Sequence, residues 1–454
     1  MTAAGGEGTA AEGTVAEGGR RPLDAGALRS AAGRLRAARP ALLAVPAARL
    51  AELLGGVGER FLDPADPLRE EALARVPQEA GISPAMAERV VAGMARDWTR
   101  ARLAALLAAE FPQPGVLDRF TPAGSGPPRA LRALGDALAL HVGSGSVPGV
   151  CATSLIRSLL VKTPVLVKPG AGDRALTELF LHGLREADAD VAAAAAVRYW
   201  PGGDPAPLDA TLALVERVVA YGSDATMAAI RNRLPVSVPL VAYHHRSSVA
   251  VLGPEAVRSP ALARTAADLA FAVATFDQRG CVSPHRAWVL GDREEARRLA
   301  AATAEALTLE AHAAPPGPRT PDEAARLRQA VSGVEVRRAA GAPVELWGGV
   351  PEGWAVILEE PCRLETVGAP RTLVLTWAAD PAEVAAALAD EGAHLQSAGV
   401  AGLGGSAEAA VEMLVRAGVT RVAPLGELPF PPAWWLHDGQ GPLRALVRWT
   451  AWEA

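Results

Sequence analysis

Residues 163–170, TPVLVKPG, followed by residues 173–187, DRALTELFLHGLREA, decide the fold of this chain. A short apolar run ending in a Pro-Gly turn predicts a buried strand, and apolar residues three and four positions apart then predict an amphipathic helix. The alternation continues through VVAYGS (218–223) and VPLVAYHH (238–245). Repeated strand-helix units favour a parallel sheet, so we predict an α/β fold of a nucleotide-binding type with ligands at the carboxyl ends of the strands.

Outward from this region the chain divides into further segments. Residues 25–110 carry apolar residues at helical spacing and predict a helical front segment, which the Pro/Gly-rich stretch TPAGSGPPR (121–129) separates from the strands. Later strand-helix units predict a second α/β domain, and a tail with four of the ten tryptophans is expected to pack back on the body. The predicted division is a disordered leader (1–22), the front segment with a cofactor-type domain (23–247), the second domain (248–425) and the tail (426–454).

The composition excludes several classes of protein. The 454 residues are 50% hydrophobic and 21% charged, as in a folded multidomain chain, and a net charge of −5 gives no positive field for nucleic acid or an anionic membrane. The apolar stretches fall short of the roughly 20 residues that cross a bilayer, and the first residues do not resemble a signal peptide. Three scattered cysteines cannot form a disulfide framework, so we expect free thiols in the cytoplasm.

Cys281 is the leading candidate for catalysis. It lies in the polar loop DQRGCVSPH (277–285), whereas Cys151 lies in an apolar helical segment and Cys362 has no reactive group nearby. A free cysteine is commonly inert, but the start of the next element and Arg279 are expected to lower the pKa of the Cys281 thiol and make it a nucleophile. His285 reaches this thiol only if the intervening turn is sharp, so a surface position is the simpler expectation.

A second candidate site lies at the strand ends. The chain has two lysines, and Lys168 ends the strand at 163–170, where an ammonium group can reach a ribose hydroxyl or phosphate; chance survival on the surface is the alternative. Gly222 and Ser223 join a strand to a helix, so backbone N–H groups there form an anion site. The loop GSGSVPG (143–149) lacks the spacing of a dinucleotide fingerprint or a P-loop.

Metal binding is not expected from the histidine pair. His244 and His245 are adjacent on a predicted strand, and neighbouring side chains on a strand point to opposite faces. No HExxH motif or spaced acidic partner accompanies them. We therefore predict no metal site.

Taken together, these motifs resemble a known family. The strand end VLVKPG, the turn AYGS and the loop cysteine follow one another as in the aldehyde dehydrogenase superfamily. Within it, GSGSVPG, DQRGCVSPH and GVTRVAPLGELPFPPAWWLHDG (418–439) are similar to the bacterial acyl-CoA reductases of the LuxC type, which make fatty aldehydes for luminescence. The resemblance runs from about residue 130 to the C-terminus. It implies an aldehyde dehydrogenase-like fold with a Rossmann-type cofactor domain and an α/β catalytic domain.

The resemblance also implies a reaction and residues for it. Cys281 would attack the thioester of an acyl-CoA or acyl carrier protein, and hydride from a nicotinamide would reduce the resulting acyl-enzyme to an aldehyde. Lys168 would contact the adenosine ribose, with Gly222 and Ser223 along the pyrophosphate. Related folds commonly pair, so a homodimer is expected by analogy.

The cofactor that the resemblance favours is NADPH, with NADH as the alternative. Ala171 stands where NAD-preferring relatives often have a carboxylate, so a 2′-phosphate would meet no repulsion there, and Arg174 is a candidate partner for it.

Two departures from the superfamily refine the expected reaction. The stretch LVAYHHRSS (240–248) lacks the glutamate with which hydrolytic aldehyde dehydrogenases activate water, which favours thioester reduction over oxidation to an acid. Ser146 replaces an oxyanion-stabilising asparagine, and its hydroxyl would act together with the Cys281 backbone N–H. A cysteine acyltransferase or thioesterase without hydride transfer, and a catalytically silent scaffold, are the competing functions.

Overall fold

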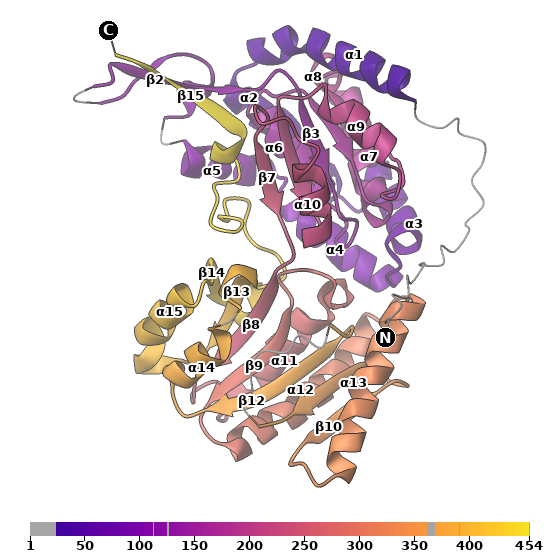
Figure 1. Ribbon diagram of the computed structural model, residues 1–454, viewed down its shortest axis with the longest axis vertical. Coiled ribbons are helices and arrows are strands. Elements are labelled where there is room, and N and C mark those ends of the chain that lie inside the picture. The colour runs from indigo at the N-terminus through magenta and orange to yellow at the C-terminus, as the bar shows by residue number, and fades with distance from the viewer. Residues whose placement is uncertain (1–23, 112, 125–126, 361–367, 390, 454) are drawn as a thin grey trace, which may run out of the picture.

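The chain folds into two α/β units and a small projecting sheet, as the computed structural model shows (Figure 1). The structure describes residues 24–111, 113–124, 127–360, 368–389 and 391–453. The predicted leader (1–22) and Cys362 lie outside the described residues. Mixed α/β architecture with parallel sheets and a helical front segment confirms the predicted fold class.

Five helices of the described chain form the front segment. Asp66, Ser83 and Thr99 each accept a backbone N–H at a helix start, as N-cap residues do. Gly81 ends one helix with φ of 60°, a left-handed conformation that glycine adopts without steric strain. The helices are α1 (Ala25–Ala44), α2 (Ala47–Arg60), α3 (Pro67–Ala80), α4 (Pro84–Arg96) and α5 (Arg100–Glu110).

The first large sheet has five parallel strands in the order β5-β4-β3-β6-β7. The first of these strands in chain order, β3, lies in the centre of the sheet. The chain places β4 and β5 on one side of it and then β6 and β7 on the other. This reversal is the switch point at which nucleotides bind in open α/β sheets. The strands are β3 (Ala139–Val142), β4 (Val165–Lys168), β5 (Ala195–Val197), β6 (Arg217–Tyr221) and β7 (Leu240–Tyr243); the helices are α6 (Val150–Leu160), α7 (Arg174–Ala187), α8 (Ala189–Ala192), α9 (Pro205–Leu212) and α10 (Asp224–Arg231).

The second large sheet has seven strands in the order β10-β11-β12-β9-β8-β13-β14, of which β10 alone runs antiparallel to its neighbour. Ala250 and Leu252 pack with α11 and α12 on one face, while Val249 and Val251 pack with α14 and α15 on the other. The strands are β8 (Ser247–Leu252), β9 (Pro284–Leu290), β10 (Glu345–Gly349), β11 (Trp354–Leu358), β12 (Thr372–Ala378), β13 (Leu395–Ala401) and β14 (Arg421–Pro424). The helices are α11 (Ala261–Ala274), α12 (Arg293–Ala313), α13 (Pro321–Ala339), α14 (Pro381–Leu388) and α15 (Ala407–Arg416).

These two sheets use residues 139–243 and 247–424. The domain boundaries at residues 247 and 425 themselves stay a prediction.

A three-stranded antiparallel sheet projects from the body as an arm (Figure 1). It consists of β1 (Thr121–Pro122), β2 (Ala130–Gly135) and β15 (Val447–Trp452). Trp434 and Trp435 pack against the core, whereas Trp449 and Trp452, on β15 of the arm, remain 46% and 43% exposed. That the tail as a whole packs back on the body stays a prediction.

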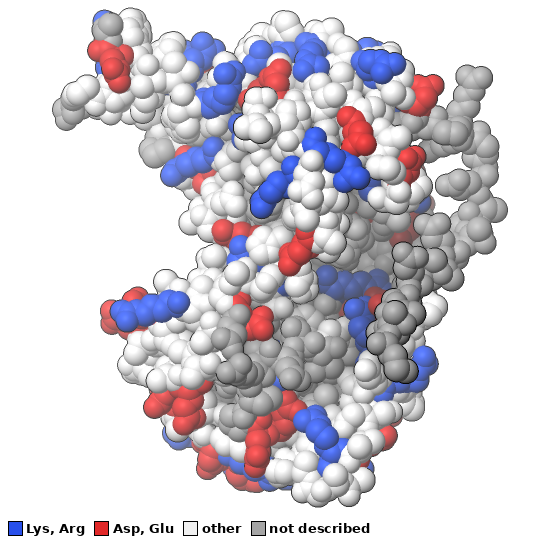
Figure 2. Space-filling view, in the orientation of Figure 1, with Lys and Arg blue, Asp and Glu red and all other residues white. Residues whose placement is uncertain are grey.

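Among the described residues, no single helix combines the length and apolar character needed to cross a membrane. Helices α1 and α2 meet that test only as a pair, bent by 112°. Figure 2 shows basic and acidic side chains interspersed on the visible face, which is hollowed between the two α/β units below the arm.

Candidate active site

Cys281 lies in a loop with an unusual backbone conformation. The three residues before Arg279, Phe276 to Gln278, have φ of 59°, 52° and 63°, a left-handed region that residues other than glycine rarely adopt. The Gln278 side chain fastens this turn to β12, because its Nε2 donates to the Thr372 carbonyl at 2.8 Å and its Oε1 accepts from the Thr372 N–H at 2.6 Å. The strained turn is therefore held from the neighbouring strand.

A buried ion pair fixes the same loop a second time. Arg371 Nη2 lies 2.6 Å from Asp277 Oδ1, and the two side chains are 1% and 5% exposed. From β8, the Ser248 hydroxyl donates to the Cys281 carbonyl at 2.6 Å. These contacts place the cysteine between α11 and β9 with little freedom.

The Cys281 thiol is half-buried, and its pKa is raised to about 11 by burial and by the negative charge of Asp438. The expectation that Arg279 lowers this pKa is wrong. Arg279 turns away from the thiol toward the front segment and α13, where it pairs with Glu323 at 2.7 Å and donates to the Ala80 carbonyl at 2.8 Å. At neutral pH the resting group is therefore a thiol.

His285 is not the surface residue expected. It is half-buried at the start of β9, and burial lowers its pKa to about 4, so the imidazole is neutral. Cys151 is buried, as expected, on α6.

Two residues that the sequence did not single out lie beside the thiol. Gln396, on β13, hydrogen-bonds to the Cys281 sulfur and donates from Nε2 to Asp438 Oδ1 at 2.8 Å. The Asp438 side chain is 1% exposed, and burial raises its pKa. Its backbone is left-handed, with φ of 52°. The HDG sequence of the tail was the available signal, because a residue followed by glycine in a tight turn often adopts that conformation.

An apolar pocket opens at the cysteine. It encloses about 900 Å³ of empty space, counting its open mouth, and combines α4, α5 and α6 with the cysteine loop and the tail. Cys281 belongs to its wall, together with Val147 and Phe430. Its other apolar walls include Met94, Trp98, Leu103, Leu106, Val150, Ile156, Phe276, Val282 and Ala433. Such a lining accommodates a hydrocarbon chain next to the thiol.

Lys168 and Arg174 lie together at the carboxyl edge of the five-stranded sheet. Lys168, at the end of β4, is only 8% exposed, so it is not the surface lysine of the alternative interpretation. Lys168 Nζ and Arg174 Cζ lie 5.9 and 4.9 Å from the centre of the Tyr199 ring. Burial lowers the pKa of Lys168. Two cations and an aromatic face are the chemistry that an adenosine phosphate requires.

Gly222 and Ser223 lie at the start of α10, as predicted. The Ser223 hydroxyl accepts the Thr226 N–H at 3.2 Å, and the Gly222 N–H donates to the Tyr243 carbonyl at 3.1 Å. A carboxylate, Asp224, occupies the first turn.

The loop 143–149 is fastened by a buried carboxylate that the sequence did not reveal. Asp173 accepts the backbone N–H groups of Gly149 and Cys151 at 2.5 and 2.7 Å, and burial raises its pKa to about 7. Ser146 is exposed in this loop, next to Val147 in the pocket wall.

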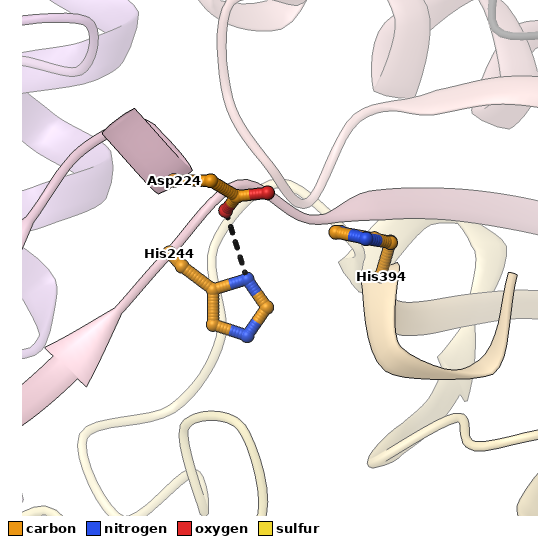
Figure 3. Close-up of side chains that lie close together, drawn as sticks. All are labelled: Asp224, His244 and His394. Carbon is orange, nitrogen blue, oxygen red and sulfur yellow. Dashed lines mark ion pairs between the residues drawn. The ribbon is translucent and has the colours of Figure 1, made fainter. Parts of the chain in front are cut away.

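Asp224, His244 and His394 form a cluster at the junction of the two units (Figure 3). His244 Nδ1 lies 3.3 Å from Asp224 Oδ1, and the three potential ligand atoms lie within 4.8 Å of one another. Tetrahedral zinc sites with bonds of about 2.1 Å require ligands about 3.4 Å apart, so this cluster would have to tighten around an ion. The prediction of no metal site remains a prediction, but His244 has partners other than His245.

Comparisons with known proteins agree with this arrangement. The family model for acyl-CoA reductase (LuxC) matches residues 49–449. The long-chain acyl-protein thioester reductase of Vibrio harveyi is 25% identical over 188 residues, which is 40% of this chain and 38% of that protein. Its counterpart from Aliivibrio fischeri is 23% identical over 181 residues, 39% and 36% of the two chains. The matches thus span little more than a third of these relatives.

Solved structures show the fold. A NAD-dependent benzaldehyde dehydrogenase from Corynebacterium glutamicum superimposes with a TM-score of 0.71 at 15% identity, covering 94% of this chain and 90% of the other. A NADP-dependent glyceraldehyde-3-phosphate dehydrogenase from Bacillus halodurans, complexed with NADP, gives 0.72 at 14% identity with the same coverage. The aldehyde dehydrogenase-like fold is therefore confirmed, and because its model matches most of the sequence, this chain belongs to the acyl-CoA reductase (LuxC) family.

Proposed function

We propose that this chain reduces an acyl thioester to an aldehyde with NADPH, through an acyl group bound covalently to Cys281. One observation supports this most directly. The Cys281 thiol belongs to the wall of an apolar pocket that also includes Tyr221, at the end of β6. The thiol thus adjoins a place for an acyl chain on one side and the carboxyl edge of a nucleotide-type sheet on the other.

The reaction needs two bond exchanges at one carbonyl carbon. The Cys281 sulfur attacks the thioester carbonyl, the bond to the donor sulfur breaks, and the thiol proton leaves with the donor as its free thiol. A nicotinamide cofactor, when bound, would supply hydride to the carbonyl carbon of the acyl-cysteine. Cleavage of the C–S bond would then release the aldehyde, and the Cys281 sulfur would take up a proton from solvent. One thioester, one NADPH and one proton thus give one aldehyde, one thiol and NADP⁺.

The end of β7 supports reduction over hydrolysis, because it offers Ala242 and Tyr243 rather than a glutamate. Among the described residues that line the pocket, Asp97 is the sole carboxylate, and Arg102 lies 3.6 Å from it. The lining also includes His437, whose imidazole is kept neutral because burial lowers its pKa.

The oxyanion of the acyl-transfer step would be stabilised by the Cys281 backbone N–H and the Ser146 hydroxyl. Ser146 is exposed and precedes Val147, which lines the same pocket, and this neighbourhood supports the assignment. Both groups are hydrogen-bond donors of the kind that stabilise such a charge.

The cofactor edge supports NADPH. Lys168 is assigned to the adenosine ribose, Gly222 and Ser223 to the pyrophosphate at the start of α10, and Arg174 to the 2′-phosphate. The Arg174 Nε is buried and has no hydrogen-bond partner among the described residues, although Glu79 Oε2 lies 3.7 Å away. A phosphate would provide that missing acceptor.

We further propose that the acyl donor is an acyl-CoA or an acyl carrier protein in the cytoplasm and that the chain forms a homodimer. The arm supports pairing, because β15 is bonded to β2 along one edge only and its tryptophans are exposed.

The proposal is tested by NADPH absorbance with acyl-CoA, using the unaltered protein, Cys281→Ala and Cys151→Ala. We expect oxidation that Cys281→Ala abolishes and Cys151→Ala retains, because Cys151 is buried and is not among the residues that line the pocket. Thiol release without NADPH oxidation would identify an acyltransferase or thioesterase instead. The absence of both reactions would identify a silent scaffold.

A further inference from the structure

The acyl pocket contains a buried cation that the reaction does not use. Arg157, on α6, belongs to the pocket wall although it is only 8% exposed. Its Nε is buried and has no hydrogen-bond partner among the described residues. The Tyr221 hydroxyl lies beside its guanidinium group. A guanidinium is fully charged at any physiological pH, so an empty donor in an apolar cavity requires an explanation.

The nearest acidic group does not satisfy Arg157. Asp97 lines the same pocket. Burial raises the pKa of Asp97 to about 6, and the positive charge of Arg157 is one of the charges that oppose this increase. The ion pair of Asp97 is nevertheless with Arg102, at 3.6 Å, and no described ion pair includes Arg157 within 4.0 Å. A donor and an acceptor therefore face the same cavity without bonding each other.

A second donor in the pocket wall also lacks a partner. Trp435 lines the pocket from the tail, and its indole N–H is buried with no partner among the described residues. Each unsatisfied buried group of this kind destabilises the protein unless a ligand or water completes it. Two donors without a partner and one carboxylate, in a mainly apolar wall that also includes Thr153, Tyr221 and His437, point to a polar substituent on the occupant.

We propose that the preferred substrate is a hydroxyacyl thioester, whose chain hydroxyl accepts from Arg157 and Trp435 and donates to Asp97. This deepens the proposed function and rests on it for the thioester. A hydroxyl both donates and accepts, so it matches the set. A plain alkyl chain would leave the Arg157 Nε and the Trp435 indole N–H without an acceptor, and a carboxylate on the chain would be repelled by Asp97.

Binding tests this without turnover. In Cys281→Ala protein, dissociation constants are compared by calorimetry for the decanoyl thioester of N-acetylcysteamine and for four variants carrying one hydroxyl at carbon 3, 5, 7 or 9. Hydrogen bonds to charged groups change affinity by about 10- to 100-fold. We expect one hydroxylated probe to bind at least about tenfold more tightly than decanoyl.

Side-chain variants assign the effect. Arg157→Met should remove the preference and leave decanoyl binding equal or tighter, because the methionine retains the apolar stem. Trp435→Phe, which deletes the indole N–H and keeps an aromatic ring, should reduce the preference several-fold and provides the test if Arg157→Met does not fold. Arg96→Met is the matched control, since Arg96 is exposed on α4 and does not line the pocket, and should retain the preference.

The outcomes separate this inference from the proposed function. If decanoyl binds as tightly as every hydroxylated probe, or if a preference survives both Arg157→Met and Trp435→Phe, the inference is wrong even where the unaltered protein oxidises NADPH. Tighter binding of a decanoyl probe with a terminal carboxylate would also overturn it. Hydroxyl-selective binding without NADPH oxidation would support the inference and reject the reductase.

Discussion

At the scale of single residues, the reactivity of Cys281 is set by its burial and by one carboxylate. With a pKa of about 11, about one thiol in ten thousand is ionised at pH 7. Alkylation by iodoacetamide should therefore be slow at neutral pH and rise about tenfold per pH unit up to about pH 10. The site-specific rate is obtained by mass spectrometry, with Cys281→Ala as the blank. A plateau below pH 8 would show that the thiolate is already stabilised.

Asp438→Asn should make this thiol more reactive at neutral pH. The substitution removes a negative charge that raises the pKa of Cys281, so the pKa falls and more thiolate is present. We expect the alkylation rate at pH 7 to rise several-fold in the same assay. Asp190→Asn, an exposed position on α8, is the matched control and should leave the rate unchanged. A slower rate in Asp438→Asn would contradict the electrostatic assignment.

Arg174 should govern the choice of cofactor. Arg174→Met removes a donor assigned to the 2′-phosphate, so the KM for NADPH should rise about tenfold while that for NADH changes little. Steady-state kinetics with both cofactors measure the ratio. Arg185→Met, on the exposed side of the same helix, provides the comparison and should alter neither value. Equal increases in the KM for NADPH and for NADH would show that Arg174 does not contact the 2′-phosphate.

At the scale of secondary-structure elements, a glycine on α4 allows the tail to pack. A Cβ at Gly93 would overlap the Phe430 ring, and both residues line the acyl pocket. Gly93→Ala should therefore destabilise the protein by about 1–3 kcal/mol, despite the higher helix propensity of alanine. Gly33→Ala on α1, where a Cβ meets nothing within 4 Å, should be neutral or stabilising by up to about 1 kcal/mol. Urea unfolding measures both, and equal changes would contradict the packing argument.

The buried ion pair should hold the cysteine loop. Arg371→Met leaves Asp277 buried and unpaired, so we expect a loss of about 3–5 kcal/mol in unfolding free energy. Thermal unfolding of this variant is compared with that of Arg416→Met, whose pair with Glu412 is exposed and should contribute less than about 1 kcal/mol. A change in Arg371→Met as small as in Arg416→Met would show that the loop does not depend on the pair.

The elements themselves could largely be predicted. Buried strands such as β4 and amphipathic helices such as α7 follow from the period of their apolar residues, which is a local property. The left-handed turn at residues 276–278 could not be predicted, because its sequence TFDQ has no glycine. Its conformation depends on contacts with Thr372 and Arg371, about 95 residues further along the chain.

At the scale of the whole molecule, the candidate site joins segments from the entire chain. The acyl pocket combines front helices with the tail, and Glu110 accepts the backbone N–H groups of Leu443 and Arg444 at 2.9 Å each. Cys281 and Lys168 could be selected from the sequence by residue type and local context. Asp438, Gln396 and Arg157 could not, because their significance arises only when distant segments meet.

This arrangement also explains why the thiol was wrongly expected to be acidic. Arg279 is close to Cys281 in sequence, but its guanidinium pairs with Glu323. The charge that does reach the thiol comes from Asp438, on the tail, and has the opposite sign. The local sequence therefore indicated Cys281 as the candidate nucleophile but did not indicate its electrostatic surroundings.

The most direct measurement is intact-mass spectrometry of the protein mixed with an acyl-CoA, first without and then with NADPH. We predict an adduct of one acyl group on Cys281, formed without cofactor and lost on addition of NADPH with one equivalent oxidised and one aldehyde released. NADPH oxidation by Cys281→Ala, or an adduct that persists unchanged after NADPH is added, would contradict the account.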